Sequence, residues 1–141
     1  MSGHDYTVEF RIFSDTLDPS AITRELDLKP CQTRVEGALG PGGRVLKGMW
    51  AFDGAEGSNN WESLEDGLNF VLDKLWPQRK SIAKYRSSGR LVWWCGNFQS
   101  SVNGGLTLSA GLLERLGEFG AELFIDTYFS NSAEKERGFA S

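Results

Sequence analysis

The sequence is poor in the side chains on which most catalytic and metal sites depend. It contains a single histidine, His4, and only two cysteines, Cys31 and Cys95. Ser-His and Cys-His nucleophiles and multi-histidine metal sites need histidines held within the fold, so a lone histidine near a mobile N-terminus argues against all three. The cysteines also lack C-x-x-C spacing, so we expect two buried free thiols, no metal site and no cofactor.

Long apolar runs and an excess of positive charge are missing as well. No stretch approaches the roughly 20 apolar residues that span a bilayer, and residues 1–5 are too short and polar to begin a signal peptide. The formal net charge is −4. Affinity for phosphate backbones comes from clustered Lys and Arg, so we expect no nucleic-acid partner, no membrane partner and a cytoplasmic location.

Aromatic residues, in contrast, are abundant. The 141 residues include five Trp and nine Phe, and 40% of the chain is hydrophobic. This length suits one domain with one core. We therefore expect a single domain over residues 1–141, with an ordered core at about 6–129 and a polar tail at 130–141.

Four segments have the pattern of β-strands, near 6–13, 45–52, 90–98 and 122–129. Residues 6–13 give the clearest signal, because apolar residues alternate with polar ones as in a strand with one buried face. Residues 90–98 are apolar on both faces. A sheet covered by helices on one face and only partly on the other accounts for both patterns.

Three helices are expected between these strands. Asp18 and Pro19 suit the N-cap and first position of a short helix, and Ser109 suits the N-cap of another that ends at Gly120. Between them, an apolar stripe from Trp61 to Leu75 predicts a long helix, with Asn59 and Glu62 as a capping box and Pro77 as a kink. The basic run 79–86 then falls at the helix end, where the dipole favours positive charge.

These elements predict an α+β domain. A mostly antiparallel sheet packs against three helices, in a ferredoxin-like arrangement or as duplicated strand-helix-strand units. Residues 32–48 contain several glycines around Gly40-Pro41-Gly42-Gly43, which predict a loop or a hairpin with a wide tip. No Lys-Ser/Thr and no G-x-G-x-x-G helix start follows them, so turn geometry explains these glycines better than a phosphate-binding loop.

Four segments carry a resemblance to a known family. They are LDPSAITRELDLKP, GMWAF, LEDGLNFVLDKLWPQRKSI and NGGLTLSAGLLERLGEFGAELFIDTYF. These segments resemble the bacterial family called domain of unknown function 4279. The likeness extends from Tyr6 to Phe129, and its most specific parts are Asp18-Pro19, Gly104-Gly105-Leu106 and Asp126-Thr127-Tyr128-Phe129. The glycine-rich loop at 37–48 departs from the pattern. The resemblance implies an α+β fold and a bacterial, intracellular setting, and it brings no established activity.

The candidate binding residues are Trp50, Trp93, Trp94, Asp126 and Tyr128. Adjacent strand residues face opposite ways, so Trp93 and Trp94 cannot share one core and one of them needs a second cover. An indole on an open face is a common anchor in binding surfaces, although any single Trp can equally fill the core. Asp126 lies on one face between Phe124 and Tyr128, where it is either a raised-pKa acid or a hydrogen-bonded buried carboxylate.

Two functional hypotheses follow. The preferred one is a non-enzymatic binding module that contacts a protein partner, or a second copy of itself, and an immunity-type inhibitor of a basic toxin is one such role. The alternative is a small-molecule-binding protein or carboxylate-based enzyme centred on Asp126, with Asp53 as a neighbour. It requires a pocket of roughly 300 Å³ or more, beneath the glycine-rich loop, at which the two acids converge.

Overall fold

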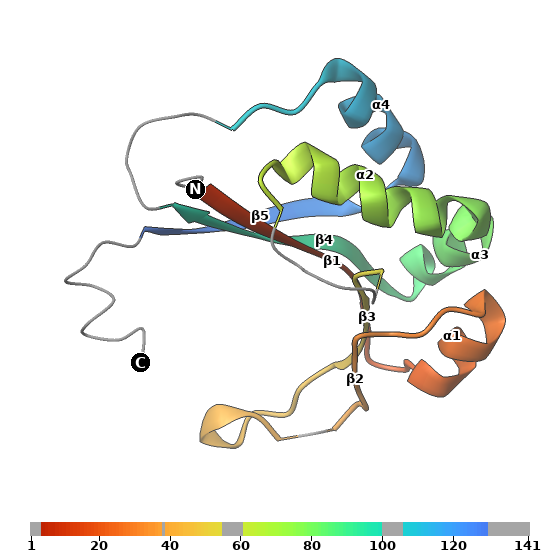
Figure 1. The fold of residues 1–141 in the computed structure, drawn as a ribbon. Helices are drawn as coiled ribbons and strands as arrows, with labels where there is room; N and C mark the ends of the chain where they lie inside the picture. The colour runs from red at the N-terminus through yellow and green to blue at the C-terminus, as the bar shows by residue number, and fades with distance from the viewer. Residues whose placement is uncertain (1–3, 38, 55–60, 100–105, 130–141) are drawn as a thin grey trace.

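A five-stranded sheet forms the centre of the computed structural model, which describes residues 4–37, 39–54, 61–99 and 106–129 (Figure 1). Helices are stacked against it (Figure 1). The elements in chain order are β1 (His4–Ser14), α1 (Pro19–Leu26), β2 (Gln32–Arg34), β3 (Gly48–Phe52), α2 (Leu64–Leu75), α3 (Arg79–Ala83), β4 (Gly89–Gln99), α4 (Ala110–Phe119) and β5 (Glu122–Phe129).

The strand order is β2-β3-β1-β4-β5. Three of the four pairings are antiparallel, and only β4 and β5 run parallel. Parallel neighbours need a crossover, which α4 supplies between them. The α+β prediction with a mostly antiparallel sheet is confirmed. The strands that flank α1 and α4 are arranged differently. Beside α1, β1 and β3 run antiparallel, whereas β4 and β5 on either side of α4 run parallel.

The predicted helix caps are present. The Asp18 side chain accepts hydrogen bonds from two amides at the start of α1, and the Ser109 hydroxyl accepts one from the Leu112 amide at the start of α4. At the end of α4, Gly120 has φ of 84°, in the left-handed region that favours glycine. These caps satisfy amides that a helix end otherwise leaves without partners.

The long central helix begins later than the sequence pattern suggested. Its N-cap is Ser63, whose hydroxyl accepts from the Asp66 amide, whereas the expected capping residue Asn59 lies outside the described residues. Trp61 is not helical. It forms an isolated bridge with Tyr6 through two backbone hydrogen bonds of 2.8 Å. Near Pro77, a short 3-10 turn (Trp76–Gln78) separates α2 from α3, so the expected interruption is found.

The core lies between the helices and one face of the sheet. Helices α2 and α4 lie on the same side of β1, β4 and β5 (Figure 1). Phe10, Trp50 and Trp93 are fully buried on that face, and the rings of Phe10 and Trp93 both contact Phe119 of α4. Burying one large apolar side chain contributes about 1.5–3 kcal/mol, so these contacts anchor the helix layer.

Two sequence expectations need correction. Cys95 is buried as expected, but Cys31 is exposed; both thiols are unpaired. Burial raises the pKa of the Cys95 thiol to about 12, which keeps it as an unreactive thiol. His4 was expected in a mobile terminus, yet its backbone is the first residue of β1 and pairs with Gln99.

Candidate functional site

The sheet face away from the helices carries a cluster of aromatic rings at its β5 end. We call Trp94, Phe98, Phe124 and Tyr128 the aromatic patch. In the parallel register of β4 and β5, Trp94 lies beside Phe124 and Phe98 lies beside Tyr128. Since residues side by side in a ladder point to the same face, the four rings share one surface.

The rings of the patch pack in two pairs. The centroids of Trp94 and Phe124 are 4.5 Å apart, and those of Phe98 and Tyr128 are 4.9 Å apart with nearly parallel planes. Both pairs fall in the range of favourable aromatic contacts. Phe98, Phe124 and Tyr128 nevertheless remain 40–41% exposed. The rings are therefore preordered against one another while a large part of their surface faces solvent.

A charged pair from β1 borders the patch. The Arg11 guanidinium lies 4.4 Å from the centroid of the Trp94 ring, and its Nε donates to the Glu9 carboxylate at 2.9 Å. A cation over an indole face is attracted to the ring quadrupole, and Glu9 fixes its direction. Trp94 is only partly buried, and these contacts hold its ring in place.

Asp126 lies between the aromatic pairs on the same face. Its carboxylate accepts a hydrogen bond from the Tyr128 hydroxyl at 2.5 Å. That bond raises the pKa of Tyr128, because it favours the protonated phenol. Asp126 is half-buried rather than sealed in the core. The Asp126 side chain therefore holds the Tyr128 ring and adds an acidic group to the patch.

The structure divides the predicted binding residues into two groups. Trp94, Asp126 and Tyr128 are brought together on the open face. Trp50 and Trp93 lie in the core beneath the helices with no exposed surface. The Trp50 indole nitrogen donates to the Thr23 hydroxyl of α1 at 3.0 Å, which ties it to the helix layer.

Strand β5 forms one edge of the sheet. Within the described part of the chain, no strand pairs with its outer side. It is eight residues long, and Leu123, Phe124, Tyr128 and Phe129 on it are all exposed. A long, apolar, unpaired edge is a template for pairing with another chain. The patch is therefore continuous with a second feature suited to association.

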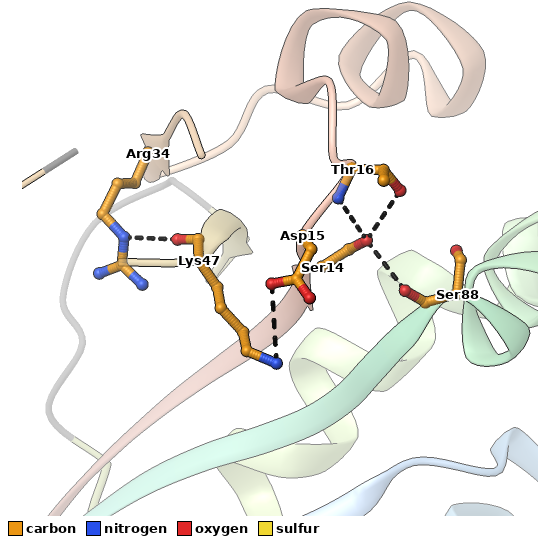
Figure 2. Close-up of polar contacts among 6 residues, drawn as sticks. All are labelled: Ser14, Asp15, Thr16, Arg34, Lys47 and Ser88. Atoms are coloured by element: carbon orange, nitrogen blue, oxygen red, sulfur yellow. Dashed lines mark hydrogen bonds and ion pairs between the residues drawn. The ribbon is translucent and has the colours of Figure 1, made fainter. Parts of the chain in front are cut away.

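A cavity of about 330 Å³ lies at the start of β4, away from the aromatic patch. Three stretches distant in sequence line it: residues 13–15 at the end of β1, Arg34 with residues 44–47 of the β2–β3 connection, and residues 88–90 at the start of β4. Figure 2 shows Arg34 Nε donating to the Lys47 carbonyl at 2.8 Å, and the Lys47 ammonium 3.8 Å from the Asp15 carboxylate. The charged side chains that line the cavity are mostly basic.

The two acids proposed for a carboxylate-based site do not converge. Asp126 is on β5 and Asp53 follows β3, with β1 and β4 between those strands. At about 4.8 Å per strand, the strands are about 14 Å apart. The cavity is indeed lined in part by the glycine-rich connection, but neither Asp126 nor Asp53 lines it.

Sequence reasoning missed part of both regions. Phe98 lies on the same face of β4 as Trp94, and Phe124 lies on the same face of β5 as Tyr128. The alternation of side chains along each strand could therefore have identified both residues as part of the patch. Arg34, Arg44 and Arg90 meet at the cavity only through the strand order. No local spacing in the sequence brings these three residues together.

The geometry defines a protein of the α+β class, with helices on one face of a mixed sheet and an aromatic patch on the other. Within this class, residues 4–130 match the family described as Domain of unknown function (DUF4279), and the chain belongs to that family. No curated protein and no solved structure matches the chain. None of the described helices is long and apolar enough to cross a membrane.

Proposed function

We propose that this domain is a non-enzymatic binding module that takes a protein partner on the aromatic patch and the outer edge of β5. The observation that carries the proposal is the exposure of Phe98, Phe124 and Tyr128, each about two-fifths open to solvent on one sheet face. Aromatic residues are the usual anchors of protein interfaces, because they bury much area with little loss of conformational freedom.

The edge of β5 supplies the second half of the proposed interface. An extended segment of a partner can add to this edge through main-chain hydrogen bonds, while its side chains contact the patch. Affinity then comes from the backbone pairing and specificity from the rings. Asp126 and the net charge of −4 favour a partner with basic side chains near that segment.

An immunity-type role fits this partner chemistry. Many toxins that act on nucleic acids are basic, and an acidic protein can cover such a surface by charge complementarity. We place this role in the bacterial cytoplasm, in keeping with the family resemblance and the low cysteine content. A carboxylate-based enzyme has less support, because Asp126 and Asp53 are separated by two strands.

Photo-crosslinking from the patch tests the proposal. A photoreactive amino acid at Phe98 is compared with one at Leu113, which is also exposed but lies on α4. The expected result is one basic protein that crosslinks from Phe98 and not from Leu113 in native lysate. Phe124→Ser with Tyr128→Ser should abolish that crosslink, whereas Leu113→Ser should leave it intact.

Other results would count against the proposal. Equal crosslinking from Phe98 and Leu113 indicates nonspecific adsorption. A crosslink only to a second copy of the chain, with a dimer mass in light scattering, replaces the foreign partner by self-association. Absence of any specific product from Phe98 in a lysate of the native host removes the binding-module proposal.

A further inference from the structure

The cavity at the start of β4 has a charge pattern that the proposed protein-binding function does not use. Its charged lining consists of four cations, Arg34, Arg44, Lys47 and Arg90, and one acid, Asp15. This concentration of positive charge stands out in a chain with a net charge of −4. The cavity is also separate from the aromatic patch, because Arg90 and Phe98 are near opposite ends of β4.

Two of the four cations already have carboxylate partners. Arg90 makes two hydrogen bonds to Glu122, at 3.0 and 2.8 Å, and Lys47 lies 3.8 Å from Asp15. Among the described residues, neither Arg34 nor Arg44 forms an ion pair with an acid. Within the part of the chain that the structure describes, the cavity therefore retains two guanidinium groups without an acidic partner.

Hydrogen bonds hold two parts of the cavity wall in place. Arg34 Nε donates to the Lys47 carbonyl, which fastens β2 to the start of β3 and leaves the two terminal nitrogens of Arg34 as donors. On the other wall, the Ser14 hydroxyl donates to the Ser88 carbonyl at 2.9 Å and also accepts from the Thr16 amide (Figure 2). The end of β1 is thereby joined to the turn before β4. These two parts of the wall are therefore preformed, as ligand pockets usually are.

We infer that this cavity binds a small molecule bearing a phosphate monoester, with Arg34 and Arg44 as the main charge partners. A phosphate monoester carries a charge of about −1.5 to −2 at neutral pH, which matches two unpaired guanidinium groups. Arginine presents a planar fork of donors that suits phosphate oxygens. The volume of about 330 Å³ limits the ligand to a small molecule. No glycine-loop cradle is required, because side chains supply the charge.

Asp15 modulates the site in this arrangement. Its carboxylate pairs loosely with Lys47 when no anion is bound, since both side chains are largely exposed and 3.8 Å apart. An incoming phosphate competes with Asp15 for the ammonium and is repelled by the carboxylate. Removing the Asp15 charge should therefore tighten binding, an effect opposite in sign to removing a cation.

Amide NMR titration of the full chain with glycerol 3-phosphate tests the inference, with inorganic phosphate and acetate in parallel at constant ionic strength. We expect saturable shifts concentrated at residues 44–47 and 88–90. Acetate should bind more weakly because it carries one charge. Tighter binding of the ester than of inorganic phosphate would identify an organic phosphate as the ligand, and equal binding would identify the free anion.

Exposed-residue variants make the test specific. Arg44→Gln should weaken phosphate binding about three- to fivefold, the effect of removing one exposed charge partner. Arg24→Gln is the matched control, because Arg24 is also exposed but lies on α1 outside the cavity. Asp15→Asn should tighten binding. The inference is overturned by unsaturated shifts, by equal weakening in Arg24→Gln, or by acetate binding as tightly as the phosphates.

Discussion

Trp93 and Trp94 are neighbours on β4, yet they belong to two different environments. Trp93 points into the helix-covered core and has no exposed surface, packed against Phe10 and Phe119. Trp94 points to the open face, where it contacts Phe124 and Arg11 and stays partly exposed. The pleat of a strand imposes the opposite directions, but only the helices make one side a core.

The two faces therefore hold their aromatic residues in different surroundings. On the covered face, the rings interlock with helices and stabilise the fold. On the open face, the rings of the aromatic patch contact mainly one another. An exposed cluster of this kind contributes less to stability than buried rings do, and it is the surface on which we propose that a partner binds. Substitutions on the two faces should consequently separate stability from binding.

The largest effect is expected for Trp93→Ala. Truncating a fully buried Trp removes its packing and leaves a cavity, which typically costs about 3–5 kcal/mol of unfolding free energy. Urea denaturation followed by circular dichroism measures this change. Much of that loss should be recovered in Trp93→Phe, because Phe restores most of the ring that Ala removes and leaves a smaller cavity. An effect of Trp93→Ala no larger than that of Trp94→Ala would contradict the assignment of the two faces.

Trp94→Ala should destabilise the protein by a smaller amount, about 1–2 kcal/mol, because the ring is only partly buried. The same substitution should greatly reduce partner binding, since it removes one ring of the aromatic patch and the support of Phe124. Urea denaturation and the crosslinking yield from Phe98 measure the two effects on one variant. Loss of stability with unchanged crosslinking would exclude a binding role for Trp94.

Ser109→Ala tests how the helix layer is held over Trp93. The Ser109 hydroxyl caps α4 and also donates to the Glu65 carboxylate of α2 at 2.8 Å. Loss of an N-cap costs about 1 kcal/mol. We expect a lower urea midpoint and unchanged crosslinking from Phe98. Ala110→Ser, one residue along and exposed, serves as the control with no expected loss.

The smallest effect is a pH dependence of the same helix contact. Hydrogen bonds from the Ser109 amide and hydroxyl lower the pKa of Glu65 below its usual 4.5. A carboxyl with a lowered folded-state pKa stabilises the fold above pH 4.5, and this contribution is lost as the pH falls through the folded pKa.

Glu65→Gln should therefore reduce the loss of stability on acidification below pH 4.5. Urea midpoints measured across that range, for the wild type and the variant, test this expectation. Asp66→Asn is a control, because the Asp66 side chain is exposed at the start of the same helix. An acid-induced loss that is unchanged by Glu65→Gln would show that the contact contributes nothing to stability.

Local patterns in the sequence were sufficient for most of the secondary structure. The caps at Asp18 and Ser109, the ending at Gly120 and the alternation in β1 depend on interactions within a few residues, which is why they could be predicted. The start of the long helix was misplaced because Trp61 fits the apolar stripe of α2 but pairs with the Tyr6 backbone instead. A contact between residues so far apart leaves no local signature.

The opposition of Trp93 and Trp94 was determined by the sequence itself, since neighbouring residues of a strand must face opposite ways. Which indole became core and which became surface was decided by the tertiary structure, through the side on which α2 and α4 pack. The same holds for the basic cavity, where Arg34, Arg44 and Arg90 meet only because β2, β3, β1 and β4 lie side by side in the sheet. Strand order is a long-range property, and charges brought together by it cannot be recognised from their spacing along the chain.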